Sequence, residues 1–326
     1  MENDSRAIQR VLEKFPSANV SVTPTPIYKL SRLSSGLGHN IYIMREDLTG
    51  FAIGGNKVRK LDYLIGDAMA QKADTLITVK ASNFSRNAAA AGRVFGLDVH
   101  VILDGPESEQ NPASQALFTQ FGASLYYTGR DDPDAVSAEY KKVADDLKRQ
   151  GREIYELHPG GSDEIGSLGY VNAFDEIVHY SQSSGVHFSK IIHSTGSTAT
   201  QVGLLLGQHI CAYDTTIIGM AASQKAKVQV GRIRQLALAT ADLLQIRFDE
   251  STIIVEDRFI GPGYAMQSKE GSEATKMFAV TEGILLDDVY TGKAAAGLIH
   301  YARHDLLEED ENTLFIHTGG NAGQFY

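Results

Sequence analysis

The hydrophobic positions of the chain follow two spacings that alternate along its length. Residues 40–47 alternate apolar and polar side chains as a β-strand does, and residues 74–79 form a short apolar run. Between these segments, apolar residues such as Leu61, Leu64 and Ala68 recur at helical spacing. A strand, a helix and a second strand therefore begin a pattern that continues to the end of the chain.

The later segments repeat this pattern of strands and helices. Further strands are predicted at residues 99–105, 124–129, 153–159, 190–195, 215–222, 252–257 and 313–320. Helices are predicted at residues 85–96, 111–122, 133–150, 198–210, 228–244, 272–284 and 291–307. Alternating strands and helices predict an α/β fold with mostly parallel, twisted sheets that have helices on both faces.

Length and composition indicate a globular protein with two lobes. The 326 residues exceed the roughly 250–300 residues over which a single hydrophobic core usually keeps growing. Hydrophobic residues make up 43% of the chain and charged residues 21%, which excludes wholesale disorder. The first residues are amphipathic and partly acidic, and no apolar run approaches the length of a membrane span. We therefore expect a cytoplasmic protein.

Charge and residue usage narrow the classes of partner. The formal net charge is -10 and no Lys/Arg cluster stands out, so we expect neither a nucleic acid nor a membrane as partner. Cys211, the only cysteine, lies in an apolar context and is expected to be buried. It excludes an intrachain disulfide and a Cys-based metal cluster, and the histidines form no His-Glu-x-x-His motif, so no metal site is predicted. A metabolite-sized partner fits this composition.

In open α/β sheets, ligands bind where strands end and helices begin. One such turn, residues 195–200, contains Thr195, Gly196, Ser197, Thr198, Ala199 and Thr200. Small residues let the backbone approach an anion closely, and the N–H groups at the helix start and the hydroxyls are donors, which together favour a phosphate site. The alternative is an ordinary Ser/Thr helix cap. The segment matches neither the P-loop nor the dinucleotide Gly-x-Gly-x-x-Gly pattern.

Two further junctions contain polar side chains. In residues 80–87, Ser82 and Asn83 are placed either to cap a helix or to hold a ligand carboxylate. Near the C-terminus, Tyr290, Thr291 and Thr318 occur where elements meet. Lys293 occurs there too, and we expect it to be a surface charge.

Lys57 lies in the stretch GGNKVRKL, after two glycines and before a predicted helix. A lysine in a glycine turn is ordinarily a solvated cation. A reactive amine together with a phosphate site and a polar partner for a ring nitrogen is, however, what pyridoxal 5'-phosphate (PLP) requires. The sequence offers all three groups.

Several motifs carry a family resemblance. These are GGNKVRKLDYLIGDAMAQKADTLIT, HPGGSDEIGSLGY, STGSTATQVGL, IGPGY, TEGILLDDVYTGKAAAGLI and LFIHTGG. In this order, across nearly the whole chain, they resemble the D-cysteine desulfhydrase and 1-aminocyclopropane-1-carboxylate (ACC) deaminase family. The resemblance implies the tryptophan-synthase-β fold type (fold type II). It also implies a large PLP-binding lobe of residues 1–55 and 165–326, and a small mobile lobe of residues 56–164.

The resemblance also implies roles for individual residues. Lys57 would form the Schiff base with PLP, and residues 195–200 would bind its phosphate. Asn83 would bond the ring oxygen and Thr291 would face the ring nitrogen. The substrate would meet the side chains and backbone of Ser82, Asn83, Phe84, Gly161, Tyr264, Tyr290 and Thr318. Among these, Ser82, Tyr264 and Tyr290 would join Lys57 as catalytic residues.

The segment TVKASNF departs from the family pattern. The family has a Gly-Ala-x-Gln lead-in to Ser-Asn followed by a polar residue, whereas this chain has a shorter lead-in with Lys80, and Phe84 after Asn83. The change lies where the substrate carboxylate is expected to bind. It therefore suggests a substrate whose β substituent differs from a small thiol.

These observations lead to a specific functional expectation. We expect a PLP-dependent lyase, similar to D-cysteine desulfhydrase, that eliminates the β substituent of a small amino acid and releases an α-keto acid and ammonia. ACC deamination and β-replacement are alternatives, as is a PLP-binding protein with altered specificity or without turnover. A Rossmann-type oxidoreductase is disfavoured by the missing dinucleotide motif. By resemblance, we expect a homodimer.

Overall fold

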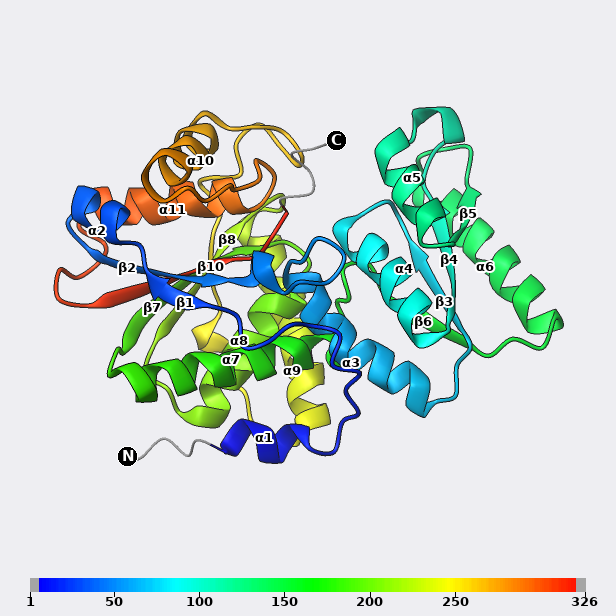
Figure 1. Cartoon of the computed structure of the whole chain (residues 1–326), viewed down its shortest axis with the longest axis horizontal. Helices are drawn as coiled ribbons and strands as arrows, with labels where there is room; N and C mark the ends of the chain where they lie inside the picture. The colour runs from blue at the N-terminus through cyan, green and yellow to red at the C-terminus, as the bar shows by residue number, and fades with distance from the viewer. Residues whose placement is uncertain (1–5, 321–326) are drawn as a thin grey trace.

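The computed structural model describes residues 6–320 and has the predicted α/β fold. Its strands form two separate sheets, one of six strands and one of four (Figure 1). We call the unit built on the six-stranded sheet the large lobe and the unit built on the four-stranded sheet the small lobe. The boundaries at residues 55/56 and 164/165 stay a prediction, although every strand of the smaller sheet falls between them.

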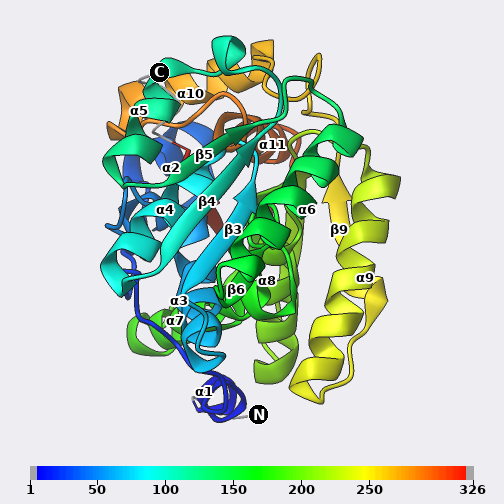
Figure 2. The same ribbon diagram turned by 90° about the vertical axis from the view of Figure 1, so that its right-hand side faces the viewer.

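The six-stranded sheet has the order β1-β2-β10-β7-β8-β9. Its strands are β1 (Ile27–Lys29), β2 (Asn40–Arg45), β10 (Asn312–His317), β7 (Phe188–Thr195), β8 (Thr216–Ala221) and β9 (Ile254–Glu256). Only β1 is antiparallel to its neighbour, and the other pairs are parallel. The four-stranded sheet has the order β5-β4-β3-β6 and is parallel throughout (Figure 2). Its strands are β3 (Thr75–Val79), β4 (Asp98–Leu103), β5 (Ser124–Tyr127) and β6 (Ile154–Leu157).

Helices cover both faces of each sheet. The first six are α1 (Ala7–Leu12), α2 (Ser31–Leu37), α3 (Asn56–Ala70), α4 (Asn83–Phe95), α5 (Pro112–Gln120) and α6 (Pro133–Arg149). The others are α7 (Glu164–Ser184), α8 (Ala199–Cys211), α9 (Ala226–Leu244), α10 (Lys269–Glu282) and α11 (Thr291–Arg303). Short 3-10 turns occur at Glu46–Leu48, Glu107–Glu109 and Glu250–Thr252.

Helix α7 is the longest helix and was not predicted. It packs against α3, α8, α1 and α9, so it is covered on several sides. Leu168, Tyr170, Phe174 and Ile177 are all fully buried along it. A helix covered on several sides lacks the single apolar stripe that makes amphipathic helices recognisable. The hydrophobic pattern therefore gave no clear helical signal here.

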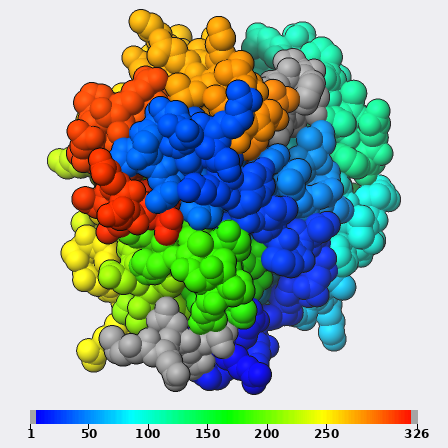
Figure 3. All heavy atoms as spheres, turned by 60° about the vertical axis from the view of Figure 1, so that its left-hand side comes forward, coloured from blue at the N-terminus to red at the C-terminus, as the bar shows by residue number. Residues whose placement is uncertain are grey.

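Segments from the two ends of the chain lie side by side in the large lobe (Figure 3). Strand β10 lies between β2 and β7, and α2 packs against α10 and α11. The buried side chains form one hydrophobic cluster around α7 and α8 and another around α10 and α11. Cys211 belongs to the first cluster and is buried, which confirms the expectation for this residue.

A buried network of charges fixes α3 to the large lobe. The Arg59 guanidinium donates to Glu46 Oε2 at 2.6 Å and to Glu176 Oε1 at 2.7 Å, and Tyr170 Oη donates to Glu46 Oε2 at 2.8 Å. Arg59 is 1% exposed and Glu46 is fully buried. Removing one partner would leave a buried charge unpaired, which is strongly destabilising. The network therefore fixes the helix that begins beside Lys57. Among residues 6–320, no helix is long and apolar enough to cross a membrane.

Candidate active site

A cavity of about 680 Å³ lies between the lobes, at the carboxyl ends of strands β3 and β7. It brings together most of the residues predicted from the sequence to form the site. Those that line it are Lys57, Ser82, Asn83, Phe84, Thr195, Gly196, Ser197, Thr198, Thr200, Tyr264, Tyr290 and Thr318. Gly161, Ala199 and Thr291 do not line the cavity.

Two glycines make the turn that places Lys57 at the cavity. Gly54 and Gly55 have φ values of 69° and 102°, which L side chains rarely adopt. A Cβ atom on Gly54 would lie 2.3 Å from the Asp47 carbonyl oxygen, so no other residue fits there. The Asn56 N–H then donates to the Thr318 carbonyl at 2.9 Å. The chain thus enters α3 with Lys57 in its first turn.

The Lys57 amine points at the turn formed by Thr195–Thr200, which we call the large-lobe turn. Lys57 Nζ donates to Ser197 Oγ at 2.6 Å and to the Gly160 carbonyl at 3.4 Å. Burial lowers the pKa of Lys57 from 10.5 to about 8, against the opposing effect of its hydrogen bond with Lys60. Because a neutral amine is the nucleophile toward a carbonyl, this environment suits covalent attachment of an aldehyde.

A second amine, Lys60, shares the same partners and was missed from the sequence. Its Nζ donates to the Gly160 carbonyl at 3.0 Å and to Ser197 Oγ at 3.2 Å. Burial lowers its pKa well below the usual value, and the charge of Lys57 adds to this effect. The spacing of Lys57 and Lys60 in the helix, three residues apart, was the available signal, since such residues share one helix face.

The large-lobe turn is unsatisfied in a way that suits an anion. Thr198 precedes α8 with φ +60°, an uncommon conformation for threonine. Ser194, next to the turn, is among the residues that line the cavity, and its buried hydroxyl has no hydrogen-bond partner among the described residues. The Thr200 hydroxyl accepts from Asn56 Nδ2 at 2.9 Å, which ties the turn to α3. A buried polar group without a partner is costly, so a ligand here would relieve the cost.

Residues 80–83 form the opposite wall, which we call the small-lobe turn. The Ser82 hydroxyl accepts from the Ser85 N–H at 3.1 Å, and the Ser85 hydroxyl accepts from the Ser82 N–H at 2.9 Å. This reciprocal capping box begins α4. The Ser85 hydroxyl also donates to the Lys80 carbonyl at 2.6 Å, which uses its single proton. The two hydroxyls are also 2.9 Å apart, so Ser82 is the donor in that contact and would have to turn away from Ser85 to donate to a ligand.

Asn83 is oriented by its neighbour Arg86. Arg86 Nη1 donates to Asn83 Oδ1 at 2.7 Å. This bond leaves the amide Nδ2 of Asn83 as the end that can donate into the cavity. Phe84, by contrast, is 1% exposed and contributes to the small-lobe core. Gly161 lies behind it, where a Cβ would come within 2.7 Å of the Phe84 ring.

Tyr264 and Tyr290 meet at the mouth of the cavity, where their hydroxyls are 2.7 Å apart. Lys293, expected at the surface, is instead fully buried, and that expectation was wrong. Its Nζ donates to the Gly263 carbonyl at 2.8 Å and to the Ala222 carbonyl at 3.3 Å. The two backbone carbonyls thus satisfy the Lys293 ammonium, and the bond to Gly263 holds the loop that carries Tyr264.

Two of the predicted cofactor-binding residues are buried outside the cavity lining. Ala199 is the first residue of α8, and its N–H donates to the Ser197 carbonyl at 2.7 Å. The Thr291 hydroxyl donates to Asp287 Oδ1 at 2.6 Å and accepts from the Asp287 N–H at 2.8 Å. Asp287 therefore already uses the proton of this hydroxyl, and the role of Thr291 at a ring nitrogen stays a prediction.

Comparison with known proteins agrees with this geometry. Residues 19–319 match the family model described as "Pyridoxal-phosphate dependent enzyme". The chain belongs to this family. The match spans both lobes and includes every residue that lines the cavity except Gly320.

Relatives within the family are similar over nearly their full length. A D-cysteine desulfhydrase of Serratia proteamaculans is 38% identical over 98% of both chains. A putative 1-aminocyclopropane-1-carboxylate deaminase of Pyrococcus furiosus is 37% identical over 98% of this chain and 96% of the relative. A crystal structure of an ACC deaminase homologue superimposes with a TM-score of 0.87 and 36% identity, covering 98% of this chain and 96% of that one.

The residues present fit the family's cofactor. Lys57 offers a partly buried amine of lowered pKa, Ser197 offers a hydroxyl beside it, and Ser194 is a further serine of the cavity lining. A Cβ on Gly160 would lie 2.6 Å from Ser197 Cβ and 3.5 Å from Lys57 Nζ, so glycine keeps this space open. The start of α8 adds a partial positive charge suited to a phosphate. These features could hold PLP between the two lobes.

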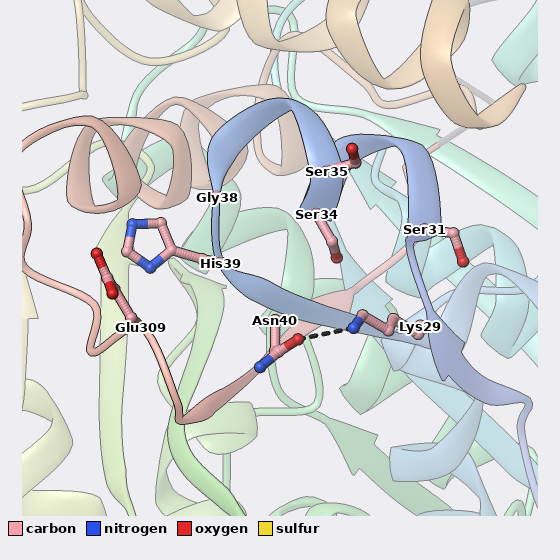
Figure 4. Close-up of a pocket in the computed structure, with 8 residues that line it drawn as sticks. All are labelled: Lys29, Ser31, Ser34, Ser35, Gly38, His39, Asn40 and Glu309. Carbon is pink, nitrogen blue, oxygen red and sulfur yellow. Dashed lines mark hydrogen bonds between the residues drawn. The ribbon is translucent and has the colours of Figure 1, made fainter.

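A second cavity, of about 320 Å³, lies on the large lobe near α2 and β2 (Figure 4). It contains none of the predicted site residues. Lys29 Nζ donates to Asn40 Oδ1 at 2.7 Å, and the Ser34 hydroxyl accepts from the Ile41 N–H at 3.0 Å. Lys29 and Asn40 thus satisfy one another, and we assign no function to this cavity.

Proposed function

We propose that the protein is a PLP-dependent lyase that eliminates the β substituent of a small amino acid, in the manner of a D-cysteine desulfhydrase. The products would be an α-keto acid, ammonia and the β leaving group. The observation that carries the proposal is the amine of Lys57 beside the large-lobe turn, with Ser82 and Asn83 on the facing lobe. The relatives named D-cysteine desulfhydrase support the reaction class.

Bound PLP would supply an electron sink that lowers the barrier to removal of the Cα proton. The residues of this chain would bind, orient and move protons around it. The large-lobe turn would hold the phosphate through Ser194, Ser197 and the backbone at the start of α8. Asn83, oriented by Arg86, would donate its Nδ2–H to the ring oxygen.

Proton transfer falls to groups at the centre of the cavity. With a pKa near 8, the Lys57 amine is neutral in a substantial fraction at physiological pH and could take the Cα proton. Ser82 would turn its hydroxyl from Ser85 Oγ to donate to the substrate carboxylate. Tyr264 and Tyr290 would cover the reacting face and limit access of water.

The test is keto-acid release by the purified protein carrying PLP. Both enantiomers of cysteine and β-chloroalanine would be assayed beside ACC, with pyruvate and 2-oxobutyrate measured separately. We expect pyruvate from at least one cysteine-like or chlorinated substrate and little or no 2-oxobutyrate from ACC. The resemblance implies that ACC deaminases have a glutamate at the position of Thr291. A threonine hydroxyl, unlike a glutamate, brings no negative charge to the ring nitrogen. Faster 2-oxobutyrate release from ACC would overturn the choice of reaction.

We also propose that the protein acts as a homodimer in the cytoplasm. The support is the resemblance to a family whose members commonly form dimers, together with similarity to relatives over their full length. Light scattering coupled to gel filtration would measure the mass in solution. A mass equal to that of one chain at micromolar concentration would reject the dimer.

A further inference from the structure

The candidate active site has an unusual charge for this chain. Its lining includes four basic side chains, Lys57, Lys80, Arg86 and Arg232, of which the last three stay charged when Lys57 is neutral. None of the described residues that line it is Asp or Glu. The protein as a whole carries a formal net charge of -10, so positive charge is concentrated at the cavity. A cleft lined by one sign of charge attracts ligands of the opposite sign.

Two of these cations have roles in the proposed function, and two do not. Lys57 would attach the cofactor, and Arg86 orients Asn83. Lys80 extends from the end of β3 in the small lobe, and Arg232 from α9 in the large lobe. A ligand between the lobes could therefore meet a positive charge from each side.

The backbone at Lys80 is in a conformation that favours glycine. Its φ is +70°, and this region costs a residue with a Cβ about 1 kcal/mol or more. Hydrogen bonds hold it there, because the Lys80 N–H donates to the Ile102 carbonyl at 2.7 Å and its carbonyl accepts from Ser85 at 2.6 Å. Glycine would adopt this conformation without strain. The lysine side chain therefore stands at the cavity despite a backbone cost.

The ion pair of Lys80 can be exchanged for a ligand. Lys80 Nζ lies 3.3 Å from Asp104 Oδ2, and the lysine side chain is 58% exposed. Exposed pairs of this kind contribute only about 0–1 kcal/mol. An anion in the cavity could therefore draw the ammonium away from Asp104 at little cost. Arg232 is also exposed, on the first half of α9.

We propose that the cavity selects an amino acid whose β carbon carries a negatively charged oxyanion, such as the sulfonate of cysteate, with Lys80 and Arg232 as the residues that recognise it. This inference deepens the proposed function and rests on it for the reaction, but not for binding. It agrees with Phe84, which brings no hydrogen-bonding group to the place where the family has a polar residue.

The reaction balances with water as the only co-substrate. The Cα proton leaves, the Cβ–S bond breaks, and its electron pair departs with sulfur as sulfite, which takes a proton to give bisulfite. Water then hydrolyses the remaining enamine to pyruvate and ammonium. Cysteate and water thus give pyruvate, ammonium and bisulfite, with no oxidant or reductant. A phosphate at the same position, as in O-phosphoserine, would leave as hydrogen phosphate.

The first experiment measures binding and does not need turnover. Calorimetric titration of the PLP-loaded protein with 3-sulfopropanoate, which has no amine and cannot react, would be compared with titration with propanoate. We expect tighter binding of the sulfonate. Lys80→Met and Arg232→Met should each weaken it about threefold to tenfold without changing propanoate binding, as expected for partly exposed ion pairs.

The matched control is Lys227→Met, which removes an exposed positive charge from the same helix as Arg232 but outside the cavity lining. It should leave both titrations unchanged. Equal binding of the two acids would overturn the proposal. The proposal would also be overturned if Lys80→Met weakened the binding of 3-sulfopropanoate and propanoate equally, because Lys80 would then bind the carboxylate that both acids share. Thermal unfolding of each variant identifies any that fail to fold, and the other variant then decides.

The second experiment measures turnover and separates the two proposals. Both enantiomers of cysteate, O-phosphoserine and uncharged β-chloroalanine would be compared by kcat/KM. A higher kcat/KM for cysteate would support recognition of a sulfonate by Lys80 and Arg232. A higher kcat/KM for O-phosphoserine would support recognition of a phosphate at the same site. Preference for β-chloroalanine that Lys80→Met leaves unchanged would overturn the inference but not the lyase. Sulfonate binding with no keto acid from any substrate would reject the lyase while leaving the anion site standing.

Discussion

The two turns that face each other across the cavity are built from the same kinds of residue but differ in their hydrogen bonds. The small-lobe turn closes on itself, since Ser82 and Ser85 cap α4 reciprocally. Beside the large-lobe turn the Ser194 hydroxyl has no partner among the described residues, and within the turn Ser197 Oγ accepts from the amines of Lys57 and Lys60. Ser/Thr-rich turns therefore divide into those whose hydroxyls cap the N–H groups of the helix and those whose hydroxyls are available to a ligand. Only the geometry distinguishes them.

The largest expected effect tests whether Lys57 attaches the cofactor beside the large-lobe turn. Lys57→Ala should abolish covalent attachment completely while the protein stays folded, because only a positioned amine can hold PLP through a covalent bond. Visible absorbance and borohydride trapping would be measured, with exposed Lys225→Ala as control. Equal trapping in the Lys57→Ala variant and the parent would reject the assignment.

The next effect concerns the hydroxyls of the large-lobe turn. Replacing Thr195, Ser197 and Thr200 together by alanine should weaken PLP retention about tenfold to a thousandfold, since each neutral hydrogen bond contributes roughly 0.5–1.5 kcal/mol. Dialysis against PLP-free buffer and thermal unfolding of the apoprotein would be compared. If the apoprotein is destabilised and retention is unchanged, the turn is a helix cap like its counterpart.

A third prediction concerns the pH dependence of PLP uptake, which distinguishes Lys57 from a lysine of ordinary pKa. Uptake of PLP by the apoprotein should accelerate about tenfold per pH unit below pH 8 and level off above it, because only the neutral amine reacts. The folded pKa lies below the unfolded one, so the unfolded chain binds more protons between about pH 8 and 10.5. Apoprotein stability should therefore rise with pH in that window. A rate still rising tenfold per unit up to pH 10 would contradict the lowered pKa.

The smallest effect tests the small-lobe turn as a cap. Ser85→Ala removes one half of the capping box and should cost about 1 kcal/mol of stability, a typical value for a lost cap. Chemical denaturation would measure this loss, and PLP retention should stay unchanged. A large loss of PLP in this variant would show that the Ser82–Ser85 cap supports cofactor binding as well as the helix, and the contrast between the two turns would fail.

The sequence predicted the fold well because its signals are local. Strand β3 and helix α8, for example, lie within a residue or two of residues 74–79 and 198–210. Helix α7 was missed because neighbours cover it on several sides. Lys57 and the large-lobe turn could be identified from the glycine pair and the small residues of their motifs. The D-cysteine desulfhydrase resemblance then made the cofactor specific, and the family match agrees with it.

Contacts between distant segments could not be predicted in the same way. The burial of Lys293 depends on carbonyls of Ala222 and Gly263, which the chain brings together only in three dimensions. The shared partners of Lys60 likewise come from residues 160 and 197. Buried polar partners are set by tertiary packing, and hydrophobic periodicity carries no information about them.

The order of strands has a consequence for how the chain folds as it is synthesised. The four-stranded sheet is complete once residue 157 has left the ribosome, whereas β10, residues 312–317, lies in the interior of the six-stranded sheet. Until β10 emerges, β2 lacks its parallel neighbour, and its open edge is exposed to other nascent chains. The small lobe can thus mature early, while the six-stranded sheet of the large lobe stays incomplete until β10 has been synthesised.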